Sequence, residues 1–221
     1  MLKSNDSEDL LFLSLLESIA QKDFQGVVDL VSQGVNINLG LFNDVTPLGL
    51  AVKKKELKLV DFLVSKGANL EAIDNYGNTP LMLAADTNNL PVVEFLVSNG
   101  ANIETEDIFG KTPLLRAAKE GEFKLVEFLV SKGANIEAKD NRGRTPLLEA
   151  EYKGDLKMVE FLVSKRVNLA AKNNAGKGVL ALAKKEEVSN FIRKTLRERI
   201  IPILEKLFIK DLAGIVANFL Y

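Results

Sequence analysis

The segment Gly110-Lys111-Thr112 is the part of this sequence that most resembles catalytic machinery, because Gly-Lys-Thr ends the phosphate-binding loop of many nucleotide hydrolases. That loop needs a further glycine at position 105, where this chain has Thr105, and Pro113 follows the threonine directly. Related Gly-x-Thr segments stand at 77–79 and 143–145, without a lysine. The segment is therefore predicted to be a turn and to bind no nucleotide.

Few other residues could carry out chemistry. The 221 residues include no cysteine and no histidine. Disulfides, thiolate nucleophiles and imidazole bases are thus excluded, and the commonest metal ligand is missing. We predict a protein that is not an enzyme and holds neither a cofactor nor a metal ion.

Charge and hydropathy set further limits. The formal net charge is −1, so no overall positive field attracts nucleic acid or an anionic membrane. The basic run 53–55 has no interleaved aromatic residues and is predicted to be a solvated helix end. No stretch reaches the roughly 18 apolar residues of a membrane span, and acidic residues precede the short apolar run 10–16, unlike in a secretion signal. We expect a cytoplasmic protein, or one exported into a host cell.

The phrase Thr-Pro-Leu recurs with a fixed step of 33 residues, which is typical of stacked repeat units. Its four copies begin at Thr46, Thr79, Thr112 and Thr145. Threonine suits a helix N-cap and proline the first helical turn, so each phrase predicts the start of a first helix. A second helix follows, for example Leu90–Ser98, with a predicted buried stripe at Leu90, Val93, Leu96 and Val97. Gly100 would end that helix, and residues 101–110 predict an extended finger with a tight turn.

These features resemble the ankyrin repeat family, whose pattern runs Asp-x-x-Gly-x-Thr-Pro-Leu-x-x-Ala. The chain matches it at 74–84, 107–117 and 140–150. The resemblance implies an all-α, ankyrin-type solenoid of helix-turn-helix repeats with finger-like turns and a C-terminal helical cap. We expect a repeat domain over 1–190 and a helical extension over 191–221. The domain would contain a degenerate first copy at 10–36, full repeats over about 41–172 and a degenerate last copy at 173–190.

Several residues depart from the family pattern. A histidine usually follows Thr-Pro-Leu and joins neighbouring repeats by hydrogen bonds, but here the four positions hold Gly49, Met82, Leu115 and Leu148. We predict that apolar packing replaces this network from Met82 to Leu148. Arg166 replaces a helix-ending glycine, so a left-handed backbone there would cost about 1 kcal/mol more than with glycine. Pro202 predicts a helix break or a new first turn.

The resemblance implies reversible binding of a partner protein by the finger tips and the outward side of the first helices. Successive copies of one tip position hold Tyr76, Phe109 and Arg142, which we predict to form a continuous row. Together with Ile108 they would form the centre of the binding surface. An ion pair between Arg116 and Glu149 is predicted on adjacent first helices. The alternative is that turn tips tolerate any residue. The full set of candidate partner-binding residues is Tyr76, Ile108, Phe109, Lys111, Arg142, Arg144 and Tyr152.

The tail has three interpretations. Its sequence looks like the short F-box-like tail of some pox-viral and intracellular-bacterial ankyrin proteins, although Phe208 stands where such tails have proline. A tail of that kind would recruit a ubiquitin-ligase adaptor. Otherwise it would cap the last repeat or mediate self-association. The apolar residues concerned are Leu207, Leu212, Ile215, Phe219 and Leu220.

Overall fold

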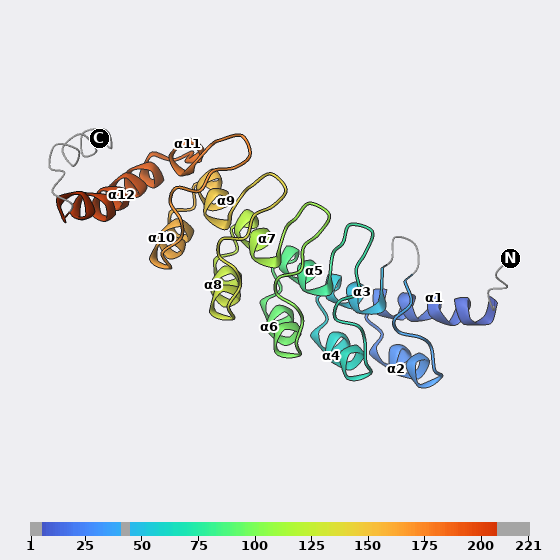
Figure 1. Ribbon diagram of the computed structural model, residues 1–221. Helices are drawn as coiled ribbons and strands as arrows, with labels where there is room; N and C mark the ends of the chain where they lie inside the picture. The colour runs from blue at the N-terminus through green and yellow to red at the C-terminus, as the bar shows by residue number, and fades with distance from the viewer. Residues whose placement is uncertain (1–5, 41–44, 207–221) are drawn as a thin grey trace. The chain divides into compact units, whose positions relative to one another are not determined.

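A computed structural model describes residues 6–40 and 45–206 of the protein, and their regular structure is helical (Figure 1). The helices are α1 (Asp6–Ala20), α2 (Phe24–Ser32), α3 (Pro47–Lys53), α4 (Leu57–Ser65), α5 (Pro80–Asp86), α6 (Leu90–Ser98), α7 (Pro113–Glu120), α8 (Phe123–Ser131), α9 (Pro146–Lys153), α10 (Leu156–Ser164), α11 (Val179–Leu182) and α12 (Glu186–Lys206).

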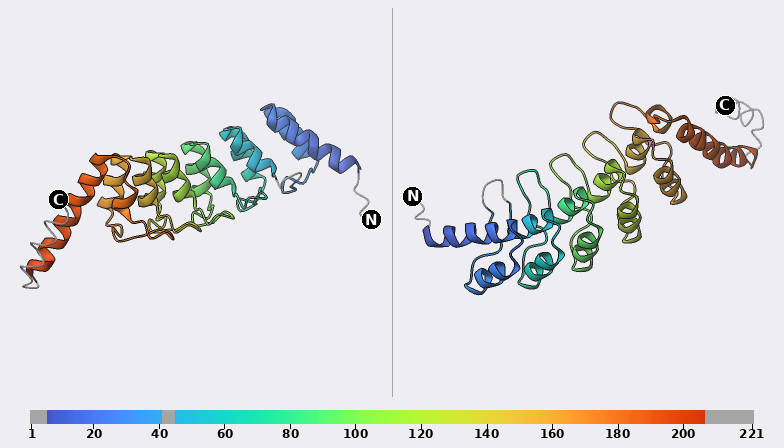
Figure 2. Two further views of the ribbon diagram at one scale, coloured as in Figure 1. Left: turned by 90° about the horizontal axis from the view of Figure 1, so that it is seen from above. Right: turned by 180° about the vertical axis from the view of Figure 1, so that it is seen from behind.

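The chain forms two compact units. Unit 1 comprises residues 1–117 and 124–134, and unit 2 comprises residues 118–123 and 135–221. In unit 1, α3 packs on its own second helix α4 and on the first helices α1 and α5. In unit 2, α9 packs in the same way on α10 and α11. Both views of Figure 2 show these helix pairs. The predicted all-α fold class of ankyrin-type, solenoid-forming helix pairs is thus confirmed.

The first helices begin where the Thr-Pro-Leu phrases predict. The hydroxyls of Thr46, Thr79 and Thr145 accept hydrogen bonds from backbone N–H groups three residues later, at 3.1 to 3.3 Å. Each hydroxyl satisfies a donor that a helix start leaves free. Proline occupies the first turn of each of these helices. Local side-chain chemistry therefore sets the start of these first helices.

Apolar side chains fill the position where the family usually has histidine. Met82, Leu115 and Leu148 are all buried, as predicted. On the second helix α6, the bounds agree with the prediction, but the buried residues are Val92, Val93 and Leu96. Two residues of the predicted stripe, Val93 and Leu96, are thus buried where α6 contacts α4 and α5, whereas Leu90 and Val97 are only half-buried.

Left-handed residues end the second helices. Gly67, Gly100 and Gly133 have φ angles of 85°, 91° and 90°. At the corresponding place after α10, Arg166 has a φ of 62°. Arg166 thus adopts the left-handed backbone whose cost the sequence analysis considered, and its side chain makes this conformation more costly than it is for glycine.

The prediction of a helix break or a new first turn at Pro202 is wrong. Pro202 lies inside the long helix α12 and does not break it. Proline removes one backbone donor, and Pro202 is exposed, so water can reach the carbonyl left without its partner. Val188 and Ile192 of α12 are buried, and the Arg199 guanidinium donates to the Val163 carbonyl at the end of α10 over 2.8 Å. The described part of α12 thus covers α10.

The candidate tail residues lie outside the described residues, so the interpretations of the tail as a cap, an adaptor or a self-association surface stay predictions. These residues are Leu207, Leu212, Ile215, Phe219 and Leu220. Within residues 6–40 and 45–206, no helix combines the length and the apolar character that crossing a membrane requires.

Replacing Arg166 by glycine should raise the free energy of unfolding by about 1 kcal/mol, because glycine adopts the left-handed backbone without steric cost. Chemical denaturation followed by circular dichroism measures the change. The matched control is Gly133→Ala, where an added Cβ meets no atom within 4 Å, so only the backbone effect remains. Gly133→Ala should destabilise the protein by a similar amount, and unchanged stability in both variants would contradict the argument.

Candidate functional site

An aspartate at the start of the turn holds three of the fingers that the structure describes. The Asp74 carboxylate accepts the backbone N–H groups of Tyr76 and Asn78, both at 3.0 Å. Its second oxygen accepts the Asn78 side-chain amide at 2.9 Å. Gly77, with a φ of 73°, closes the turn. Asp107 and Asp140 bind the N–H groups two and four residues later in the same way, at 2.8 to 2.9 Å.

Large apolar side chains project from the fingers of unit 1. Tyr76, Ile108 and Phe109 are 58%, 56% and 55% exposed. The backbone N–H of Ile108 donates to the Tyr76 carbonyl at 3.1 Å, so the two tips lie side by side. Ile73, one residue before the Asp74 turn, is equally exposed and was missed by the sequence analysis. The sequence signal was a β-branched apolar residue where the later copies have Glu106, Lys139 and Lys172.

The fingers of unit 2 are polar. Arg142 is exposed at its tip, and the backbone N–H of Asn174 donates to the Arg142 carbonyl at 2.9 Å. Neighbouring tips therefore bond to each other within each unit. The continuous row from Tyr76 and Phe109 to Arg142 stays a prediction, because its first two members belong to unit 1 and Arg142 to unit 2.

Tyr152 of α9 lies against two cations. The Arg144 guanidinium is 4.9 Å and the Lys184 ammonium 3.6 Å from the centre of its ring. Arg144 also donates to the Glu149 carboxylate at 2.9 Å. The predicted binding residue Tyr152 is accordingly part of a cation–π cluster, although 42% of it remains exposed.

Arg116 and Glu149, for which an ion pair was predicted, each have other partners within their own unit. Arg116 is buried and donates to Asp107 at 2.6 Å. It also bonds to Asp86 and to the side chain of Asn78. Arg116 thus joins two fingers and α5 within unit 1. The remaining candidate, Lys111, is half-buried, and its backbone N–H binds the same Asp107.

Comparison with known families explains this architecture. The protein-family model described as ankyrin repeats (3 copies) matches residues 15–107 and 103–174. The chain belongs to the ankyrin repeat family. Its repeats are of a kind that typically mediates binding between proteins. The match ends before the tail and lends no support to the F-box-like resemblance, and a search of curated proteins found no match.

Among residues 6–40 and 45–206, no cluster of three or more aspartates and glutamates is placed to hold a metal ion. The family is usually non-catalytic, and no catalytic family matched.

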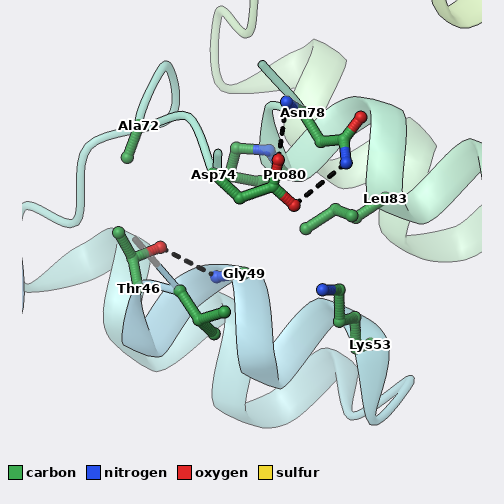
Figure 3. A pocket seen from close by; sticks show the side chains of 9 residues that line it. Thr46, Gly49, Lys53, Ala72, Asp74, Asn78, Pro80 and Leu83 are labelled. Carbon is green, nitrogen blue, oxygen red and sulfur yellow. Dashed lines mark hydrogen bonds between the residues drawn. The ribbon is translucent and has the colours of Figure 1, made fainter. Parts of the chain in front are cut away.

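A small hollow lies beside Gly49, the residue that follows Thr-Pro-Leu in α3. The hollow has a volume of only about 10 Å³ and lies between α3 and the next finger and first helix (Figure 3). Gly49 lacks the side chain that Met82 and Leu115 supply in the following repeats, so this space stays empty. Asp74, on its far side, already binds Asn78. The hollow is better explained as a packing gap than as a ligand site.

One buried carboxyl group in the repeats of unit 2 was missed by the sequence analysis. Glu151 of α9 has no exposed surface, and neither carboxyl oxygen has a hydrogen-bond partner. Burial therefore raises its pKa from 4.5 to about 8. The sequence signal was a glutamate in register with Val52, Ala85 and Ala118, which are all buried.

Glu151 should lower the free energy of unfolding as the pH rises from 4.5 to about 8. In that range the folded state keeps a proton that the unfolded state has lost, so the free energy of unfolding decreases by about 1.4 kcal/mol per pH unit for one such group. Glu151→Ala, which introduces the side chain of Ala118, should remove this dependence. Urea denaturation across this pH range measures it.

The control for Glu151→Ala is Glu160→Ala, which truncates an exposed glutamate of α10. The free energy of unfolding of this control should change with pH in parallel with that of the wild type. A parallel curve for Glu151→Ala as well would show that the buried carboxyl does not titrate with a raised pKa.

Gly49→Ala should stabilise the protein by about 0.5–1 kcal/mol, because alanine favours the helix and the added methyl group enters the hollow. The new Cβ would lie 3.4 Å from Leu83 Cδ1 and from Thr46 Oγ1, which is ordinary contact. Gly77→Ala is the matched control. There a φ of 73° and a backbone nitrogen 3.2 Å from the new Cβ predict destabilisation. Thermal unfolding compares the two, and a destabilised Gly49→Ala would show that the gap cannot accept a methyl group.

Proposed function

We propose that this ankyrin repeat protein is a non-catalytic binding module that holds a partner protein on the finger tips of unit 1. The observation that carries the proposal is the group of large apolar side chains on adjacent fingers, Tyr76, Ile108 and Phe109, each more than half exposed. Exposed apolar residues that occur singly need no explanation, but contiguous ones mark interaction surfaces. Aromatic residues are also enriched where binding energy concentrates.

The rigidity of the fingers supports the same proposal. Asp74 and Asp107 fix the backbone of the two tips through hydrogen bonds of 2.8 to 3.0 Å. Arg116 then ties Asn78 of one finger to Asp107 of the next. A surface held in one conformation loses little entropy when a partner binds. The tips are accordingly suited to recognition by a preformed surface.

The alternative, that turn tips accept any residue, explains single exposed side chains better than it explains this group. Ile73 lies beside the same turn and is as exposed as the three tip residues. Four large apolar residues on two neighbouring fingers would be a liability for a protein that binds nothing there. A partner protein that covers them removes this apolar area from water, which favours binding.

Simultaneous replacement of Tyr76, Ile108 and Phe109 by alanine should weaken partner binding at least about tenfold, because the apolar centre of the surface is lost. Cross-linking in an extract identifies the partner captured by the wild-type protein. Titration calorimetry with that purified partner then measures both affinities.

The matched control replaces three exposed leucines of unit 1 outside the fingers, Leu10, Leu13 and Leu57, by alanine. It removes a similar apolar area and should leave the affinity near that of the wild type. Circular dichroism verifies that both variants fold. An unchanged affinity of the finger variant would refute the proposal.

A further inference from the structure

The two finger turns of unit 2, residues 138–145 and 171–178, carry positive charge and expose no carboxylate. Glu137, half-buried just before the first turn, accepts the backbone N–H of Asn168 at 2.6 Å. In residues 138–145 and 171–178 the cations are Lys139, Arg142, Arg144, Lys172 and Lys177. The acidic residue of these segments, Asp140, is buried and accepts the backbone N–H groups of Arg142 and Arg144. In the second finger Asn173 takes its place. Both turns therefore present only positive side-chain charge to solvent.

Stacking of the fingers brings these cations into rows. The Asn174 backbone N–H and side-chain amide donate to the Arg142 and Asn141 carbonyls, each at 2.9 Å, so the fingers are neighbours. The 33-residue step then places Lys139 beside Lys172, and Arg144 beside Lys177. Like charges held side by side repel each other, and an anionic partner relieves that repulsion.

Neighbouring groups leave most of this charge uncompensated. Within the described part of the chain, Lys139, Arg142, Lys172 and Lys177 form no ion pair. Glu149 of α9 compensates Arg144 alone. Lys184, exposed over the Tyr152 ring, adds a further cation.

We propose that this cationic finger surface, formed by Lys139, Arg142, Lys172, Lys177 and Lys184, binds an acidic protein segment rich in aspartate and glutamate. The inference extends the proposed protein-binding function to a second set of fingers with a different chemistry. Fixed positive charges on a rigid turn attract such a segment and orient it, and binding weakens as salt screens the charges.

A protein segment fits this surface better than a nucleic acid does. Binding of single-stranded nucleic acid combines cations with aromatic rings on which bases stack. The two fingers contain no aromatic residue, and the nearby Tyr152 ring already lies against Arg144 and Lys184. Carboxylates need only the cations.

The test measures binding of a fluorescent synthetic peptide in which aspartate and glutamate alternate with glycine and serine. Its control peptide carries asparagine and glutamine in their place. Fluorescence anisotropy with the full chain should show binding of the acidic peptide that weakens as salt is added, and no binding of the amide peptide. Absence of acidic-peptide binding at low salt would overturn the inference.

Charge reversal locates the site. Arg142→Glu, Lys172→Glu and Lys177→Glu in one variant should weaken peptide binding about tenfold or more. The matched control replaces three exposed lysines outside the fingers by glutamate: Lys157 in α10, Lys165 directly after α10 and Lys194 in α12. Its change in net charge is the same. This control should stay within about twofold of the wild type. Equal losses in the two variants would overturn the inference, since net charge alone would then explain binding.

Two further measurements complete the test. Tighter binding of a single-stranded oligonucleotide than of the acidic peptide would also overturn the inference. The variant with alanine at Tyr76, Ile108 and Phe109 should keep its peptide affinity, because those tips belong to unit 1. Failure of the peptide experiments therefore leaves partner capture by the apolar tips to be judged by its own test.

Discussion

The proposed binding surfaces depend on one side-chain oxygen at the start of each finger that the structure describes. In three fingers it belongs to an aspartate, and in the last to Asn173, which accepts the N–H groups of Ala175 and Lys177 at 3.0 Å. Because the amide makes the same two bonds as the carboxylates, the turn requires an acceptor at this position and not a charge. The backbone is thereby fixed independently of the tip residue, so Tyr76, Phe109 and Arg142 can differ without loss of the turn.

Features that follow from local rules were predictable from the sequence. The threonine caps, the glycines with positive φ, the left-handed Arg166 and the burial of Met82 each depend on one residue and its place in the 33-residue register. The apolar tips could be selected for the same reason, since the copies differ most just before Thr-Pro-Leu. Exposure of Ile73 could have been inferred by the same comparison of copies.

Features that depend on distant partners could not be predicted in this way. Arg116 bonds to residues 9, 30 and 38 positions away, and no spacing rule distinguishes these partners from the predicted Glu149. Glu151 shows the opposite case, a carboxyl group placed in an apolar position where neither oxygen finds a partner. Helix α12 passes through Pro202 because the position is exposed, and the sequence around a proline does not reveal exposure.

The contacts of Arg116 also bear on how such an array can evolve. Repeat proteins change length when whole repeats are duplicated or lost, which is tolerated as long as each new junction resembles the old one. Two of the three partners of Arg116, Asn78 and Asp86, belong to the preceding repeat. Loss of that repeat would leave a buried guanidinium with fewer partners, at a cost of several kcal/mol. The order of these two repeats is therefore under a constraint that the shared Thr-Pro-Leu phrase does not impose.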